Sequence, residues 1–320
     1  KADYIETASN DKPFTARQTR QGTVYFRKAA REYKFTLGDW NALQDYSLDL
    51  SGTLIRKAVR PYTFRVSVNN IVPISTLNID KQSEPSLNMD KTLIECRDYE
   101  TYDNKPTGNA PDPDHVFDEN GDERALIFMS GMTYHWHFDA KPLLVVNVTE
   151  MPVPPRPDCL IIQVNSQTDL IRVEALMSTR MSPDIKTGFN DGMYDNPFMF
   201  RRAEEYDRRF RTGLVKWISK YTSCVVSNEE TEKWLIGGFA SEDKIKIEAD
   251  QSIKNEFINN QGVMSIDTRT IFRQIHPKGQ SSLNFFLTKY KLPLKEEMEY
   301  TTMFRIYHLT HRLLELFDTR

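Results

Sequence analysis

Two carboxylates stand two positions apart, Asp98 and Glu100, at the end of a predicted strand in the stretch KTLIECRDYETYDN. Because side chains on a strand alternate between its two faces, both carboxylates point the same way and lie only a few ångströms apart. Such a pair repels itself unless a positive charge lies in front of it. Taken alone, the pair is more typical of a solvated strand end, since acidic residues lie mostly on protein surfaces. A divalent-cation site needs further carboxylates from elsewhere in the chain.

A third carboxylate follows a predicted strand–helix–strand unit. The apolar run CLIIQV predicts a strand, a helix capped by Ser166 follows, and DIKTGFN predicts the next strand, which together favour a parallel crossover. Parallel sheets place ligands at the carboxyl ends of their strands. The stretch GFNDGMYDNP lies at such an end and supplies Asn190 and Asp195, just before a helix predicted from Pro197 to about Trp217.

Three carboxylates from two strand ends, Asp98, Glu100 and Asp195, suit a two-metal hydrolytic site. Such a site holds two Mg²⁺ or Mn²⁺ ions about 4 Å apart, which activate a water and stabilise the leaving oxygen of a phosphodiester. This chemistry needs no Ser, Cys or His nucleophile. Near the same strand end, Tyr102 offers an aromatic surface on which an unpaired base could stack.

The composition indicates a globular protein, with 39% hydrophobic and 11% aromatic residues among 320. A net charge of −3 does not indicate a nucleic-acid partner, so any contact with a nucleic acid has to be made by a local group of basic residues. We find no apolar stretch of membrane-spanning length and no secretory signal, and the widely spaced Cys96, Cys159 and Cys224 fit a reducing compartment. These features predict an intracellular protein without a membrane partner.

The remaining elements follow from hydrophobic periodicity. We expect a basic helix in residues 23–40, a half-buried strand in 61–68, a domain boundary near residue 88, and strands near 125–138 and 143–148. The arginines of the helix after Pro197 are expected to pair mostly with its own acids. Further strands are predicted at KIKIE and VMSIDT, and helices at TRTIFRQI, SSLNFFLTKY and TTMFRIYHLTHRLLELF.

The motifs carry a family resemblance. Asp98-Tyr99-Glu100 and Asn190-x-x-x-Tyr194-Asp195 resemble the first two exonuclease motifs of family B DNA polymerases, Asp-x-Glu and Asn-x-x-x-Phe/Tyr-Asp. The longer stretches FRKAAREYKFTLGDW, PDIKTGFNDGMYDNPF and SIDTRTIFRQIHPKGQSSLNFFL are similar to the polymerases of asfarvirus-like large DNA viruses. The similarity covers nearly the whole chain.

The resemblance implies an α/β chain with two parts: residues 1–88, part of a polymerase amino-terminal domain, and residues 89–320, a ribonuclease-H-like 3′-to-5′ exonuclease domain with a mixed sheet flanked by helices. It implies that Asp98, Glu100 and Asp195 are catalytic metal ligands for two Mg²⁺ or Mn²⁺ ions. It also implies that Asn190, with Tyr102 as the weaker candidate, contacts the single-stranded 3′ end of a primer. A processivity factor as a further partner and the host cytoplasm as the place of action come from the same resemblance.

The chain departs from the family pattern in one respect. The third exonuclease motif, Tyr-x-x-x-Asp, and the palm signatures of the polymerase domain do not occur in it. Because the chain opens with Lys1 and closes within a predicted helix, we expect a piece of a longer protein that by itself neither polymerises nor completes the metal site. Two alternatives stay open: a binding module for single-stranded DNA or a polymerase partner that does not cut, and a stand-alone nuclease of the same superfamily.

Overall fold

The computed structural model describes residues 31–34, 40–48, 64–77, 92–105, 109–137, 139–222, 240–258, 263–296 and 298–318. The chain divides into two compact units. The first comprises Lys1–Lys91, Ser219–Phe239 and Asn260–Gly262, and the second comprises Thr92–Ile218, Ala240–Asn259 and Val263–Arg320. The boundary predicted near residue 88 and most of the basic helix predicted in 23–40 lie outside the described residues.

The described part of the first unit contains two small antiparallel pairs. Strand β1 (Asn41–Leu43) pairs with β4 (Ile71–Pro73), and β2 (Ser47–Leu48) pairs with β3 (Phe64–Arg65). The strand predicted over 61–68 is too long, because β3 is followed by the 3₁₀ turn Val68–Asn70, and a second 3₁₀ turn (Ile74–Thr76) follows β4. Asn69 and Asn70 are residues that favour turns over strands, which explains the early end.

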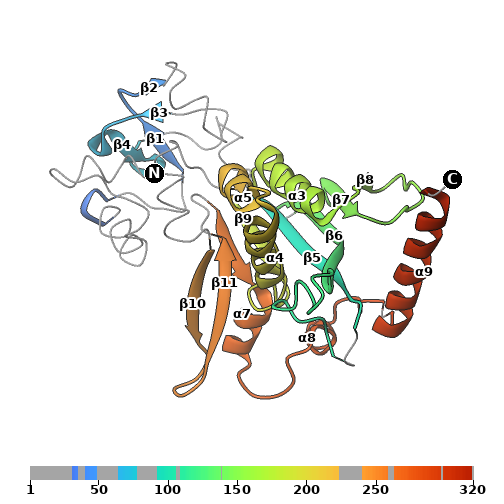
Figure 1. Cartoon of the computed structure of the whole chain (residues 1–320). Helices are drawn as coiled ribbons and strands as arrows, with labels where there is room; N and C mark the ends of the chain where they lie inside the picture. The colour runs from blue at the N-terminus through green and yellow to red at the C-terminus, as the bar shows by residue number, and fades with distance from the viewer. Residues whose placement is uncertain are drawn as a thin grey trace. The chain divides into compact units, whose positions relative to one another are not determined.

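The second unit is built on a six-stranded mixed sheet in the order β12-β9-β5-β6-β7-β8 (Figure 1). Its strands are β5 (Leu93–Asp103), β6 (Ala125–Trp136), β7 (Leu144–Thr149), β8 (Leu160–Gln163), β9 (Ile185–Gly188) and β12 (Met264–Asp267). Strand β6 runs antiparallel to β5 and β7, whereas the β12–β9, β9–β5 and β7–β8 pairs are parallel. Strands β8 and β9 therefore run in the same direction, which confirms the predicted parallel crossover.

The crossover helix α3 (Gln167–Met181) begins where the sequence predicts. The Ser166 side chain accepts a hydrogen bond from the backbone N–H of Asp169, and Ser182 ends the helix in the left-handed conformation just before Pro183. The apolar side of α3 packs on β6 and β7, and Leu170 and Ile171 are fully buried. The helix therefore covers one face of the sheet.

The single helix predicted from Pro197 to Trp217 is wrong, because two helices occupy this region. Helix α4 (Asp195–Phe210) begins two residues before Pro197, and α5 (Leu214–Thr222) follows a short break. Arg211 and Gly213 both have positive φ angles, 54° and 70°, which end α4. The Asp207 carboxylate then accepts hydrogen bonds from the backbone N–H groups of Leu214 and Val215, at 2.7 and 3.0 Å, and so caps α5.

The carboxyl-terminal half adds a hairpin and three helices. Strand β10 (Ala240–Lys246) was expected near KIKIE, but its antiparallel partner β11 (Ser252–Ile258) was not expected, because its mixed polar sequence lacks a clear alternation. Helices α7 (Thr268–Ile275), α8 (Leu283–Lys289) and α9 (Tyr300–Asp318) follow as predicted. None of the helices in the described residues is long and apolar enough to cross a membrane.

Candidate functional site

Asp98 and Glu100 share one face of β5, as their spacing predicts. The residues that alternate with them point to the opposite, buried face of the strand; these are Arg97, Tyr99 and Thr101. The Asp98 side chain is 58% exposed and the Glu100 side chain 30% exposed. The strand thus presents two carboxylates on its accessible face and anchors itself through the residues in between.

A lysine that the sequence did not single out lies in front of this pair. The Nζ atom of Lys295, in the segment after α8, lies 3.0 Å from Asp98 Oδ2 and 3.8 Å from Glu100 Oε1. Burial lowers the pKa of Lys295, but the Asp98 carboxylate and then Glu100 more than offset this, so its pKa is raised. Lys295 supplies the positive charge that the carboxylate pair requires.

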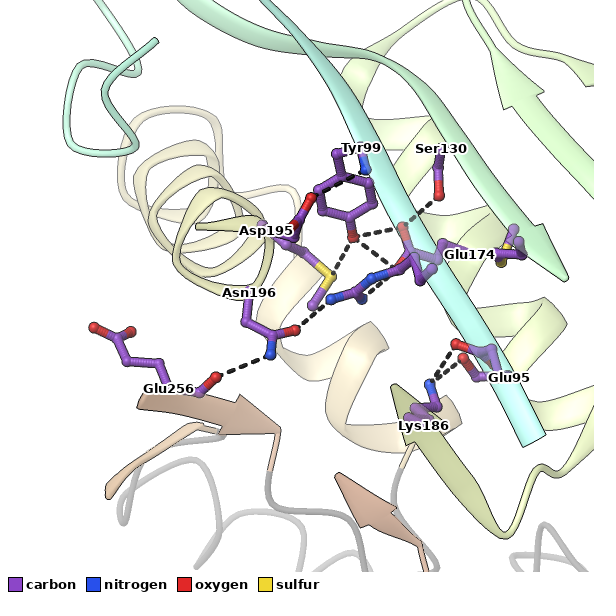
Figure 2. Close-up of polar contacts among 12 residues, drawn as sticks. Glu95, Tyr99, Ser130, Glu174, Lys186, Asp195, Asn196 and Glu256 are labelled. Atoms are coloured by element: carbon purple, nitrogen blue, oxygen red, sulfur yellow. Dashed lines mark hydrogen bonds and ion pairs between the residues drawn. The ribbon is translucent and has the colours of Figure 1, made fainter. Parts of the chain in front are cut away.

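Asp195, the first residue of α4, lies beyond the end of strand β9. Strand β9 pairs with β5 only as far as Cys96, and Asp195 Oδ1 accepts a hydrogen bond from the backbone N–H of Tyr99 at 3.0 Å (Figure 2). The side chain is buried. Burial raises the pKa of Asp195 to about 7, the negative charge of Asp98 adds to this shift, and Arg97 opposes it. Asp195 therefore titrates near neutral pH.

The three predicted metal ligands all interact electrostatically with one ammonium group, that of Lys295. Asp98, Glu100 and Asp195 all raise the pKa of Lys295, and Asp98 acts on Asp195 and on Glu100. Carboxylate oxygens are the donors that Mg²⁺ and Mn²⁺ prefer, so the donor set fits a divalent cation. Among the described residues, however, no three His, Cys, Asp or Glu side chains lie close enough together to hold a metal ion. In this conformation two of the three carboxylates, Asp98 and Glu100, form ion pairs with Lys295.

Asn190, in the turn that follows β9, is held by Arg269 of α7 and by Asp267 at the end of β12. Its Oδ1 accepts a hydrogen bond from Arg269 Nη1 at 2.5 Å, and its backbone N–H donates to Asp267 Oδ1 at 3.0 Å. Asp267 ends β12, caps α7 through the N–H groups of Arg269 and Thr270, and also accepts from Gly192 N–H at 3.3 Å. One buried carboxylate thus fixes the turn before α4 to the next strand of the sheet.

The turn between β9 and α4 is packed too tightly for larger residues. A Cβ atom on Gly188 would lie 2.8 Å from Asp191 Cβ and 2.9 Å from the Arg97 carbonyl oxygen. Asp191 is buried, and burial raises its pKa to about 7, with Arg97 opposing and Asp267 and Asp195 adding to the shift. Its Oδ1 has no hydrogen-bond partner among the described residues. A second carboxylate that titrates near neutral pH therefore lies next to the site.

Tyr102 packs against helix α9. Its ring lies 4.6 Å from the ring of Tyr307 and 5.1 Å from that of Phe304, measured between centroids. Phe128 joins the same group through Tyr307, at 5.0 Å. Part of the ring that was predicted to receive a base is therefore covered by α9, and the contact of Tyr102 with DNA stays a prediction.

A buried polar network lies beneath β5 and holds it in place (Figure 2). Arg97 Nη1 lies 2.6 Å from Glu174 Oε1, and the Tyr99 hydroxyl donates to the same carboxylate at 2.7 Å. Arg97 also donates to Asn196, whose Nδ2 donates to the Glu256 carbonyl oxygen at 2.9 Å. The network joins β5 to α3, α4 and β11. In the sequence Glu174 is one of two acids on α3, and nothing local distinguishes it.

Curated relatives of the chain come from one virus. The chain is 28% identical over 289 residues to the "DNA polymerase beta" of African swine fever virus isolate Pig/Kenya/KEN-50/1950, which covers 89% of this chain and 21% of the relative. The protein of the same name from isolate Tick/Malawi/Lil 20-1/1983 is 28% identical over 286 residues, with the same coverage. This chain is distantly related to viral DNA polymerases. It spans about a fifth of the length of these relatives. No protein-family model matches the chain.

Proposed function

We propose that the chain is the 3′-to-5′ proofreading exonuclease region of a family B DNA polymerase. The observation that carries the proposal is the position of three carboxylates at one strand end: Asp98 and Glu100 share one face of β5, and Asp195 of α4 accepts a hydrogen bond from the backbone N–H of Tyr99 between them. The distant similarity to viral DNA polymerases over 89% of the chain supports it. So does the mixed sheet with helices packed on it, since the ribonuclease-H-like resemblance implies that architecture.

In this proposal Asp98, Glu100 and Asp195 hold two Mg²⁺ or Mn²⁺ ions, which when bound supply an activated water and charge stabilisation for the leaving 3′ oxygen. Asp195 Oδ1 accepts a hydrogen bond from the backbone N–H of Tyr99, and this bond fixes the position of the other carboxylate oxygen, Oδ2, relative to β5. Lys295 neutralises the Asp98–Glu100 pair when the ions are not bound, and it competes with them for these carboxylates. Asn190, held by Arg269, positions the terminal nucleotide, and Tyr102 is the weaker candidate for contact with a base.

Polymerisation, a processivity factor and action in the host cytoplasm belong to the same proposal. They rest on the resemblance, because the relatives are named DNA polymerases and the chain spans about a fifth of their length. None of the residues described above supports polymerisation, a processivity factor or action in the host cytoplasm.

A second candidate is a binding module that holds single-stranded DNA or a polymerase partner without cutting it. It is favoured by one observation, the ion pair of Lys295 with Asp98, together with the lack of a three-ligand metal cluster in the described residues. An ammonium group in the site neutralises a carboxylate but does not activate water, so the strand would be held without being cut.

Digestion of a 5′-labelled single-stranded oligodeoxynucleotide in Mg²⁺ separates the two candidates. We expect a version extended by the coding sequence that follows Arg320 to remove 3′ nucleotides in the presence of Mg²⁺, whereas this chain alone should not. The Asp98→Ala and Asp195→Ala variants of the extended version should lose the activity. A matched control, Asp243→Ala on the exposed side of β10, should leave excision unchanged. Excision at the wild-type rate by Asp195→Ala contradicts the exonuclease proposal. Strand binding without excision by either version favours the binding module.

A further inference from the structure

The segment that contains α7 and α8 carries an unusual local charge. Residues 268–295 contain six Lys or Arg and no Asp or Glu, in a chain whose net charge is −3. These basic residues are Arg269, Arg273, Lys278, Lys289, Lys291 and Lys295. The next acidic residue along the chain is Glu296. The two helices and their connection therefore form a positive region on an otherwise slightly acidic protein (Figure 1, orange).

The charges of this region are not neutralised by ion pairs. Within the described residues, Lys295 is the one member of the six that contacts a carboxylate. Arg269 and Arg273 instead donate to the neutral side chains of Asn190, Ser281 and Gln251. By contrast, three of the four arginines of α4 are paired with carboxylates: Arg201 with Asp114 and Glu256, and Arg208 and Arg209 with Glu205. An arginine-rich helix face is therefore neutralised elsewhere in the same unit, but the α7–α8 charges stay available.

Aromatic rings are interleaved with these charges. Phe272 of α7 stacks on Phe286 of α8 at 4.6 Å and on Tyr290 at 5.4 Å. The Tyr290 side chain is exposed, its hydroxyl lies 2.8 Å from His276 Nε2, and Lys289 Nζ lies 3.2 Å from His276 Nδ1. These contacts hold the ring of Tyr290 in a fixed position next to two exposed lysines, Lys289 and Lys291.

We propose that this α7–α8 surface, made by Lys278, Lys289, Tyr290 and Lys291, binds the sugar-phosphate backbone and one base of a single-stranded nucleic acid. Lysine charges attract phosphates without sequence preference, and an exposed, fixed aromatic ring stacks on any base. The surface ends near the carboxylates, because Lys291 and Lys295 are four residues apart and their Cα atoms lie within about 14 Å. The inference rests on the proposed function in one respect, that the strand held here leads to the Asp98 and Glu100 pair.

Binding of a labelled 16-nucleotide oligothymidine, measured by fluorescence anisotropy in EDTA, tests the surface without any excision. We expect the triple variant Lys278→Gln/Lys289→Gln/Lys291→Gln to bind at least about tenfold more weakly at low salt. Its slope of log affinity against log salt should be smaller by about 2, since each phosphate contact to a single strand contributes about 0.7. The control variant Lys141→Gln/Lys216→Gln/Lys254→Gln changes the net charge equally at exposed lysines outside the surface, and should keep the wild-type slope.

Two further variants separate stacking from charge. Tyr290→Phe keeps the ring and should keep the affinity, whereas Tyr290→Leu should lose about fivefold or more. Equal affinities for the two triple variants overturn the proposal. It is also overturned if poly-aspartate of equal charge competes as well as the oligonucleotide and Tyr290→Leu is neutral, because the surface then fits an acidic protein. Failure of excision with binding intact removes the proposed nuclease activity and leaves this surface standing.

Discussion

The buried contact between Arg97 and Glu174 makes a quantitative prediction about strand β5. Their side chains are 7% and 4% exposed, so solvent screens the pair very little. The variant Glu174→Ala would leave the Arg97 guanidinium buried without its carboxylate and would remove the acceptor of the Tyr99 hydroxyl. Removal of one partner of such a pair costs about 3–5 kcal/mol of unfolding free energy. With an m-value of about 2 kcal/mol/M, the urea midpoint should fall by about 2 M.

Urea unfolding followed by circular dichroism measures this loss, and two further variants test its cause. Glu205→Ala removes the acid of an i,i+3 and i,i+4 pair on the surface of α4 and should cost less than about 1 kcal/mol. Arg97→Met/Glu174→Leu removes both charges and should recover most of the loss, because no buried charge stays unpaired. A loss below about 1 kcal/mol for Glu174→Ala, or a double variant as unstable as the sum of its parts, refutes the reasoning.

Three other predictions concern the frame of the site. Burial raises the pKa of Asp191 from 3.8 to about 7, so the folded state keeps a proton that the unfolded chain releases; stability should fall between about pH 4 and 7. Asp191→Asn should remove up to about 3 kcal/mol of this dependence between urea titrations at pH 5 and at pH 8, while Asp243→Asn should not. Ser166→Ala should lower the unfolding free energy by about 1 kcal/mol through loss of the α3 cap, and a loss matched by Ser252→Ala on β11 contradicts this. Tyr102→Ala should cost about 2–3 kcal/mol because Phe304 and Tyr307 lose their neighbour, whereas Tyr102→Phe should be neutral; equal costs for the two refute the packing role.

Local signals predicted the elements that depend on local physics. Ser166 and Asp169 mark the start of α3 because an N-cap acts within three residues. The alternation of β5 likewise placed Asp98 and Glu100 on one face. The break between α4 and α5 was missed, since the left-handed conformation of Arg211 is unusual for its residue type. The Asp207 cap of α5 spans seven residues, which is outside the three-residue pattern of an ordinary N-cap.

The contacts that complete the site are the ones the sequence could not reveal. Lys295 reaches Asp98 across 197 positions of the chain, and Glu174 reaches Tyr99 across 75. Nothing in the neighbourhood of either residue distinguishes it from an ordinary surface charge. Asp267 offered a signal, because an acid at a strand end directly before a helix is typical of a cap, but its bonds to Asn190 and Gly192 depend on the parallel pairing of β12 and β9.

Mn²⁺ binding tests most directly whether Asp98, Glu100 and Asp195 form one cation site. Isothermal titration of the folded wild type, Lys295→Ala and Lys295→Ala/Asp195→Ala measures it, with circular dichroism as the check on folding. We expect Lys295→Ala to bind Mn²⁺ about tenfold or more tightly than the wild type, since the competing ammonium group is gone, and we expect the added Asp195→Ala change to abolish the gain. If Lys295→Ala binds Mn²⁺ no better than the wild type, the three carboxylates do not share a cation and the account of the site is wrong.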